Sequence, residues 1–183
     1  MTTDARTDPR TDPPRAGDEL TLLTGFLAFH RETLRWKTAD LDTAQLDRTH
    51  SPSTMTLGGM IKHLALVESY WLTEIFRDDP ALPPFDTVDW DADADWDWHS
   101  AAGETATELW QLLDRAIAAS DAIVAETLAD PEGDGLATLS VRTSRDGDRW
   151  SLRWILIHLV EEYSRHNGHA DLIREAIDGS VGE

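Results

Sequence analysis

The chain has 183 residues, of which 40% are hydrophobic, enough for one domain with a substantial core. It contains no cysteine, which excludes disulfide bonds, thiolate metal ligands and a nucleophilic thiol supplied by the protein. Its formal net charge of -19 disfavours binding to nucleic acid and to anionic membranes, because both need a basic protein surface.

The two ends of the chain lack the pattern of a packed domain. Residues 1–17 repeat Thr-Asp, contain several prolines and have no apolar core of the kind that a signal peptide needs. We expect them to form a disordered tail, and residues 180–183 to form a short C-terminal tail. No apolar run approaches the roughly 20 residues of a transmembrane helix. These features favour a cytoplasmic protein with one folded domain over residues 18–179.

Four segments have the apolar periodicity of long amphipathic helices. They cover residues 18–37, 57–77, 101–129 and 151–177. Thr56 is a suitable N-cap for the second helix, and Gly179 is a suitable stop for the last one. Because no convincing sheet accompanies these segments, they predict an all-α fold, a four-helix bundle. Longer connections follow the second and third helices, and a short extra turn is expected at residues 41–46.

The connection at residues 80–99 is acidic and rich in tryptophan. Aspartates alternate along it at positions 89, 91, 93, 95 and 97. This run invites a calcium interpretation, but it lacks the glycine and the distal glutamate of an EF-hand loop. A solvated loop is favoured, with its tryptophans packing across the bundle or covering the mouth of a pocket. The later connection, residues 130–149, contains a candidate short strand at residues 139–141.

Ionisable side chains interrupt the apolar face of the last helix. At about 100° per residue, His158, Glu162, His166 and His169 fall within about 80° of one another, in the sector where a core-facing helix normally carries Leu or Ile. On the second helix, His63 likewise shares the apolar face. Burial of such groups without partners is costly, so we expect them to pair with one another or to surround a metal ion.

The residue types suit a divalent metal. Glu162 and His166 lie one turn apart on one face, and helix packing could bring His63 opposite them. Two imidazoles and one carboxylate suit zinc, and three protein ligands leave a coordination position open, as in catalytic sites. Nickel, iron or manganese would also be accepted. A buried network of Glu–His hydrogen bonds without a metal is the alternative. His30 is interpreted as a core histidine, and His50 and His99 as loop residues.

Two segments carry a family resemblance. The sequence GGMIKHLALVESYW, residues 58–71, resembles the second helix of the DinB-like superfamily, and WILIHLVEEYSRHNGHADL, residues 154–172, resembles its last helix. The resemblance extends over about residues 18–179. It implies a four-helix bundle with a metal held by one histidine of the second helix and a His-x-x-x-His pair of the last helix. In this chain the pair reads Glu162-x-x-x-His166. This pattern resembles that of the branch that contains mycothiol-dependent maleylpyruvate isomerase.

That branch implies a ligand set and a reaction class. The metal ligands would be His63, Glu162 and His166, with His158 and His169 as candidates for supporting or substrate-facing roles. The chemistry would be a metal-dependent S-transfer or isomerisation with a low-molecular-weight thiol such as mycothiol, bound to the metal as its thiolate. An acidic protein would need a cation near the metal to hold an anionic thiol. The candidates are Arg145, Arg149, Arg153 and Arg165.

Two other functions compete with this one. A non-enzymatic metal-binding stress or interaction protein of the same fold would hold the metal without a site for a thiol. A metal-free helical interaction module would gain no thermal stability from an added metal ion. A homodimer is expected under any of these functions, because dimerisation is common among such bundles.

Overall fold

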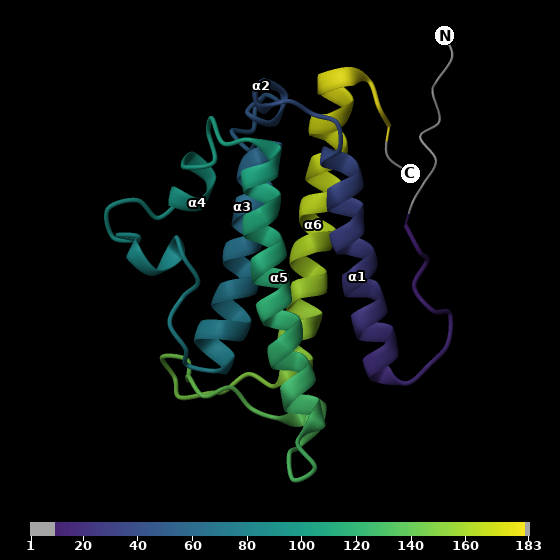
Figure 1. The fold of residues 1–183 in the computed structure, drawn as a ribbon, viewed down its shortest axis with the longest axis vertical. Coiled ribbons are helices and arrows are strands. Elements are labelled where there is room, and N and C mark those ends of the chain that lie inside the picture. Colours follow the sequence, from purple (N-terminus) through teal and green to yellow (C-terminus); the bar gives the residue numbers. More distant parts are fainter. Residues whose placement is uncertain (1–9, 182–183) are drawn as a thin grey trace.

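The computed structural model describes residues 10–181, which confirm an all-helical chain (Figure 1). The long helices are α1 (Glu19–Thr38), α3 (Leu57–Glu68) with its continuation η1 (Ser69–Phe76), α5 (Ala106–Ala129) and α6 (Leu152–Asp178). The short ones are α2 (Thr43–Leu46), η2 (Phe85–Thr87), α4 (Trp96–His99) and η3 (Gly135–Ala137). Within residues 10–181 no helix combines the length and the apolar character needed to span a membrane.

Side-chain caps set the starts of the long helices. Thr56 accepts from the amide of Gly59, and Ser151 accepts from that of Trp154, so α3 and α6 begin where the sequence predicts. The third predicted helix starts too early, because Thr105 forms a capping box with Glu108 and α5 therefore begins at Ala106. The last helix ends as expected at Gly179, whose φ of 79° is left-handed.

The second long helix changes its hydrogen-bonding pattern halfway along. It is α-helical through Glu68 and π-helical from Ser69 to Phe76, so its predicted extent is nearly right but its regularity is not. A π-helix has a wider turn than an α-helix and places successive side chains differently around the axis. Within this stretch, Trp71 lies against Trp154 and His158 of α6, at ring-centroid distances of 5.1 and 4.8 Å.

The long helices pack in pairs. Helix α1 lies along α6, α3 lies along α5, and α3 also contacts α6, so α3 and α6 join the two pairs (Figure 1). The core between them is built mainly from leucine and isoleucine, with Leu34, Leu64, Leu113 and Leu159 fully buried. An apolar cavity of about 650 Å³ lies between α1 and α5, where Ala28 and Val124 are among its walls.

The predicted strand at residues 139–141 is wrong. Leu139 forms a single antiparallel bridge with Ser151, and no strand occurs within residues 10–181. The amides of Val141 and Arg142 donate instead to the carbonyls of Phe76 and Ile75, at 2.9 and 3.1 Å. This segment therefore satisfies carbonyl groups at the end of η1, which the end of a helix leaves without partners.

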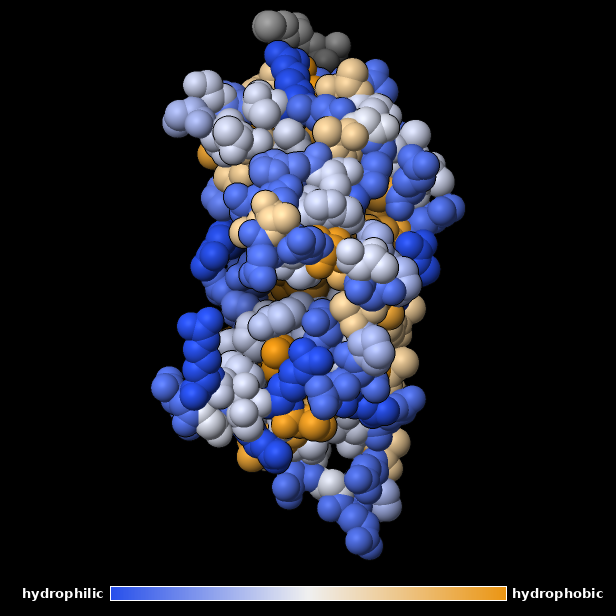
Figure 2. Space-filling model, turned by 90° about the vertical axis from the view of Figure 1, so that its left-hand side faces the viewer, coloured by the Kyte–Doolittle hydropathy of each residue, from blue (hydrophilic) through white to orange (hydrophobic). Residues whose placement is uncertain are grey.

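The acidic connection between η1 and α5 lies along one side of the molecule, with η2 and α4 inside it (Figure 1). Figure 2 shows this side, where hydrophilic side chains predominate and hydrophobic ones are confined to small separate areas. Trp90, Trp96 and Trp98 are partly buried and pack against the core. The expectation that these tryptophans pack across the helices is confirmed.

Parts of both predicted tails, residues 1–9 and 182–183, lie outside the described residues. Residues 10–17 form no helix or strand, and they lie along α1. The guanidinium of Arg10 lies 4.8 Å from the ring centroid of Phe29 and 4.4 Å from that of Trp36. Its Nη1 donates to Thr33 at 3.0 Å.

A buried ionic network ties three helices together. The Nε and Nη2 atoms of Arg31 on α1 donate to the carboxylate of Glu68 on α3, at 2.8 and 2.9 Å. The hydroxyl of Tyr163 on α6 donates to the same carboxylate at 3.0 Å. Glu68 has no exposed side-chain area. Burial, with the adjacent carboxylate, raises the pKa of Tyr163, so its hydroxyl remains a donor.

Replacing Arg31 by methionine should destabilise the fold strongly. The variant would leave the carboxylate of Glu68 buried without its cation, which typically costs about 3–5 kcal/mol. Urea unfolding of wild type and Arg31→Met measures this loss. The control is Arg77→Met, because Arg77 is 40% exposed and pairs with the exposed Glu126, so its loss should cost about 0–1 kcal/mol. Similar losses in the two variants would contradict the role given to the buried network.

Candidate metal centre

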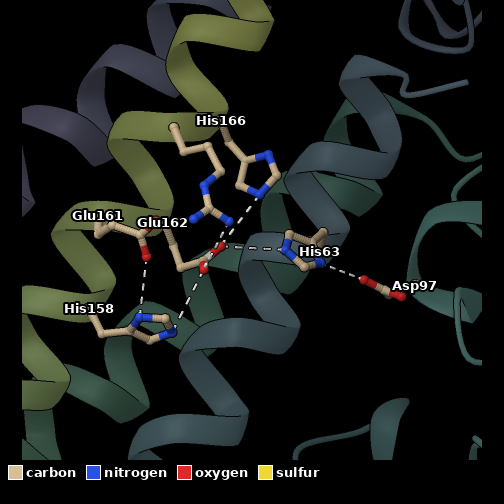
Figure 3. A network of polar contacts seen from close by, with 7 residues as sticks. His63, Asp97, His158, Glu161, Glu162 and His166 are labelled. Carbon is tan, nitrogen blue, oxygen red and sulfur yellow. Dashed lines mark hydrogen bonds and ion pairs between the residues drawn. The ribbon is translucent and has the colours of Figure 1, made fainter. Parts of the chain in front are cut away.

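The three residues predicted as metal ligands converge between α3 and α6 (Figure 3). Oε2 of Glu162 lies 3.8 Å from Nε2 of His63 and 3.5 Å from Nε2 of His166. One ligand atom from each residue lies within 4.8 Å of the others. The side chains are mostly buried, with exposed fractions of 21% for His63, 13% for Glu162 and 7% for His166. Three electron-rich atoms therefore point at one small volume.

A glycine on α3 allows an indole to pack over this volume. A Cβ atom on Gly59 would lie 2.8 Å from Cε3 and 3.2 Å from the carbonyl oxygen of Trp98. The absence of a side chain there lets the α4 segment approach α3 closely. Trp98 then stacks on the imidazole of His63, with ring centroids 4.8 Å apart and an interplanar angle of 24°. The stacking restricts the orientation of the His63 ring.

An aspartate from the acidic connection forms a hydrogen bond with His63. Oδ2 of Asp97 lies 2.7 Å from Nδ1 of His63, and only 3% of Asp97 is exposed (Figure 3). An ionised carboxylate only accepts hydrogen bonds, so Nδ1 donates to Asp97 and Nε2 is the nitrogen that faces Glu162. Histidines that bind metals commonly have such a carboxylate partner, which fixes the tautomer and the ring orientation.

Sequence reasoning missed the role of Asp97. The alternating aspartates were expected to form a solvated loop, and for Asp97 this expectation is wrong, because α4 turns its side chain inward to His63. The alternation itself does not distinguish Asp97 from its neighbours. The one usable signal is its place between Trp96 and Trp98, two residues expected to be buried.

A buried lysine anchors the segment that carries Asp97. Nζ of Lys62 donates to Glu104 at 2.7 Å and to the carbonyl of Ser100 at 3.3 Å. It also lies 4.5 Å from the ring centroid of Trp96. Lys62 is 2% exposed, and burial of an amine is tolerated when it is paired in this way. Lys62 directly precedes His63, so one turn of α3 holds both the candidate ligand and its partner segment.

Burial keeps His166 in the form that can bind a metal. Its pKa is lowered to about 3, mainly by burial, with smaller contributions from His63, His169 and Arg165. The imidazole is therefore neutral at neutral pH and has a lone pair to donate. Its buried Nδ1 has no hydrogen-bond partner among residues 10–181. The donor set, two imidazoles and one carboxylate, fits a divalent ion of the zinc type.

The two supporting candidates lie on either side of this set. Nε2 of His158 is 3.7 Å from Oε1 of Glu162, and the ring of His169 lies 5.6 Å from that of His166. Arg165 is the predicted cation that reaches the site, because its Nη1 lies 3.9 Å from Oε1 of Glu162. Arg153 pairs instead with Glu19 of α1.

The other histidines are separate from this cluster. His30 is half-buried on α1, where burial followed by the charge of Arg10 lowers its pKa. His50 is exposed in a loop, as expected. His99 was expected in a loop but ends the short helix α4, where its exposed ring lies 3.1 Å from Asp93.

Replacing Asp97 by asparagine should weaken metal binding by roughly 10–100-fold, the usual effect of removing the carboxylate partner of a ligating histidine. The amide is similar in size and its oxygen can still accept, but it has no charge, so the hydrogen bond that fixes the tautomer of His63 becomes weaker. Isothermal titration of metal-free protein with Zn²⁺ measures the change. Asp93→Asn is a matched control, because Asp93 makes the same type of contact with the exposed His99. Equal effects in both variants would argue against the assigned role.

The stability of the metal-free protein should fall as the pH is lowered. Between the ordinary pKa of 6.5 and the folded-state pKa of about 3, the unfolded chain binds a proton at His166 that the folded chain does not. The stabilisation is therefore complete above pH 6.5 and is lost progressively as the pH falls toward 3. Urea unfolding over this range should show a shallower pH dependence for His166→Gln than for wild type. An unchanged slope would contradict the depressed pKa.

Comparisons with known proteins give a family match and a similar fold. Residues 22–179 match the family described as mycothiol-S-transferase. A search of curated proteins finds no match. A solved structure, that of a conserved protein from Enterococcus faecalis, is similar in fold, with a TM-score of 0.58 and 19% sequence identity. The similarity covers 90% of this chain and 100% of the other. Since the family match includes most of the chain and all three converging residues, this protein belongs to the mycothiol-S-transferase family.

Proposed function

We propose that this protein is a metal-dependent S-transferase or isomerase that uses a low-molecular-weight thiol of the mycothiol type. The observation that carries the proposal is the convergence of His63, Glu162 and His166 in a member of the mycothiol-S-transferase family. Three protein ligands leave a position open for an incoming group, as in catalytic zinc sites. We also propose that the four long helices form a DinB-like four-helix bundle in which α3 and α6 supply these ligands.

Each residue of the site has a distinct task in this proposal. His63 and His166 offer neutral nitrogen donors, and Asp97 keeps Nε2 of His63 aimed at the shared volume. Glu162 supplies one negative charge. A divalent ion, when bound, would lower the pKa of a coordinated thiol and hold it as a thiolate nucleophile. The absence of cysteine is compatible with this chemistry, because the thiol comes from the small molecule.

The charges around the site favour an anionic ligand at one point. The protein is strongly acidic, yet the guanidinium of Arg165 lies beside Glu162 and is 56% exposed. The guanidinium also pairs with Glu161, and in exchange for that contact it can pair with a carboxylate of a thiol or of an electrophile. His158 and His169 flank the ligands and are candidates for proton transfer to or from the reacting groups.

Zinc is the proposed metal, with nickel, iron or manganese as alternatives that the same donors accept. The proposal includes a cytoplasmic location, where a low-molecular-weight thiol stays reduced, and assembly as a homodimer. If the protein binds metal but not thiol, the remaining function is that of a metal-binding stress or interaction protein of the same fold.

The test combines metal content with turnover. Elemental analysis of tag-free protein after dialysis should find about one tightly bound zinc or similar ion per chain, as expected for one set of three protein ligands. His166→Ala should lose it, and His50→Ala, which changes an exposed loop residue, should keep it. Metal-loaded wild type should then consume an electrophile only when the thiol is present.

Two outcomes would count against the proposal. Protein that holds stoichiometric metal but gives no thiol-dependent turnover over a broad panel of electrophiles would favour the non-enzymatic function. Protein that takes up no metal, and gains no thermal stability from added Zn²⁺, would leave a buried Glu–His network.

A further inference from the structure

The two oxygens of Glu162 face different sets of side chains. Oε2 faces the imidazoles of His63 and His166. Oε1 faces His158, whose Nε2 is 3.7 Å away (Figure 3). It also faces Arg165, whose Nη1 is 3.9 Å away. Both oxygens of an ionised carboxylate carry lone pairs, so one carboxylate can serve two cations at once. A metal ion held by His63, Glu162 and His166 would need only Oε2 of Glu162. Oε1 would then remain available to a second cation on the other side of the carboxylate.

The imidazole of His158 is held toward Oε1 by two indoles. Trp154 stacks on it at a centroid distance of 5.0 Å and an angle of 20°. Trp71 meets it edge-on at 4.8 Å. Rings packed on both sides restrict the rotamers of His158, so its nitrogens have fixed directions. The site is thus organised before any ligand arrives.

Both nitrogens of His158 point at carboxylates. Nδ1 lies 3.3 Å from Oε2 of Glu161, and Nε2 lies 3.7 Å from Oε1 of Glu162 (Figure 3). A histidine can bind a metal through either ring nitrogen, and both nitrogens of His158 lie near a carboxylate oxygen that could bind the same ion. His158, Glu161 and Glu162 therefore form a compact group of side chains of the types that bind divalent metals.

We propose that His158, Glu161 and Glu162 form a second divalent-cation site, with Glu162 bridging it to the first. One ligand atom from each of the three residues lies within 4.8 Å of the others. One imidazole and two carboxylates suit Zn²⁺, Mn²⁺ or Fe²⁺. Helical bundles of other metalloproteins hold pairs of metal ions between Glu and His side chains. In such a pair, the two metal ions can hold the attacking and the accepting group of a reaction. The inference rests on the proposed function for its first metal.

Arg165 sets the affinity of the second site. Its Nη2 pairs with Glu161, and its Nη1 approaches Oε1 of Glu162, so its charge occupies the region that the cation would take. The side chain is 56% exposed and has room to move into solvent. The guanidinium and the second cation therefore exclude each other, and the second ion binds more weakly than the first.

Titration of the metal-free, full-length protein with Zn²⁺ tests this arrangement. Wild type should bind two equivalents in isothermal titration, the second more weakly. Glu161→Gln should bind only the first, because it removes an exposed carboxylate that is absent from the first set. Glu175→Gln, which changes another exposed carboxylate of α6, should still bind two. Arg165→Gln should bind the second ion at least about fivefold more tightly, the effect of removing one competing charge near the protein surface.

The same variants loaded with Mn²⁺ give a second measurement. Two Mn²⁺ ions that share Glu162 should produce an exchange-coupled electron paramagnetic resonance spectrum in wild type and in Arg165→Gln. Glu161→Gln should give the spectrum of an isolated ion. Saturation of both wild type and Arg165→Gln at one equivalent would overturn the second site and leave the proposed function standing. Two equivalents in Glu161→Gln would overturn the ligand assignment, and no binding at all would overturn the proposed function as well.

Discussion

The contact between α3 and α6 is the constraint on which the rest of the structure depends. On one side of it, Glu68 is buried and held by Arg31 and Tyr163. On the other side, His63 meets Glu162 and His166. Tyr163 directly follows Glu162, so the hydrogen bond from Tyr163 to Glu68 fixes the rotation of α6 that aims Glu162 at His63. The ionic network and the candidate metal site are two faces of one helix contact.

Buried charge is tolerated here because each charged group has a defined partner. Lys62 is paired with Glu104, Asp97 with His63, and Glu68 with Arg31. Breaking a buried pair usually costs more than the pair contributes, since the remaining charge has no water around it. Such pairs favour one arrangement of the helices over slightly rotated ones. The side chains of His63, Glu162 and His166 are the exception. Their ligand atoms converge on one small volume, where a bound cation would serve as their common partner.

Local periodicity predicts the long helices and places Glu162 and His166 on one face of the last helix, whereas the resemblance to the DinB-like superfamily implies that His63 joins them. A side chain three or four positions along a helix shares its face, whatever the rest of the chain does. Asp97 and the π-helical stretch could not be predicted in this way. The inward turn of Asp97 depends on the packing of its neighbour Trp98 over Gly59 and on the anchoring by Lys62, and both Gly59 and Lys62 are distant in sequence. The strand predicted at residues 139–141 was wrong for a similar reason. The amides of Val141 and Arg142 donate to carbonyls at the end of η1, which is distant in sequence.

The π-helical stretch from Ser69 to Phe76 acts like an insertion in the middle of the second long helix. Each of its turns contains more residues than an α-helical turn, so the side chains beyond Ser69 are rotated from the positions that a continuous α-helix would give them. His63 keeps the α-helical phase, whereas Trp71 follows another. Alignment of this chain with a relative whose helix is regular would therefore need a gap between these two residues, at the boundary between the candidate ligands and the aromatic wall behind His158.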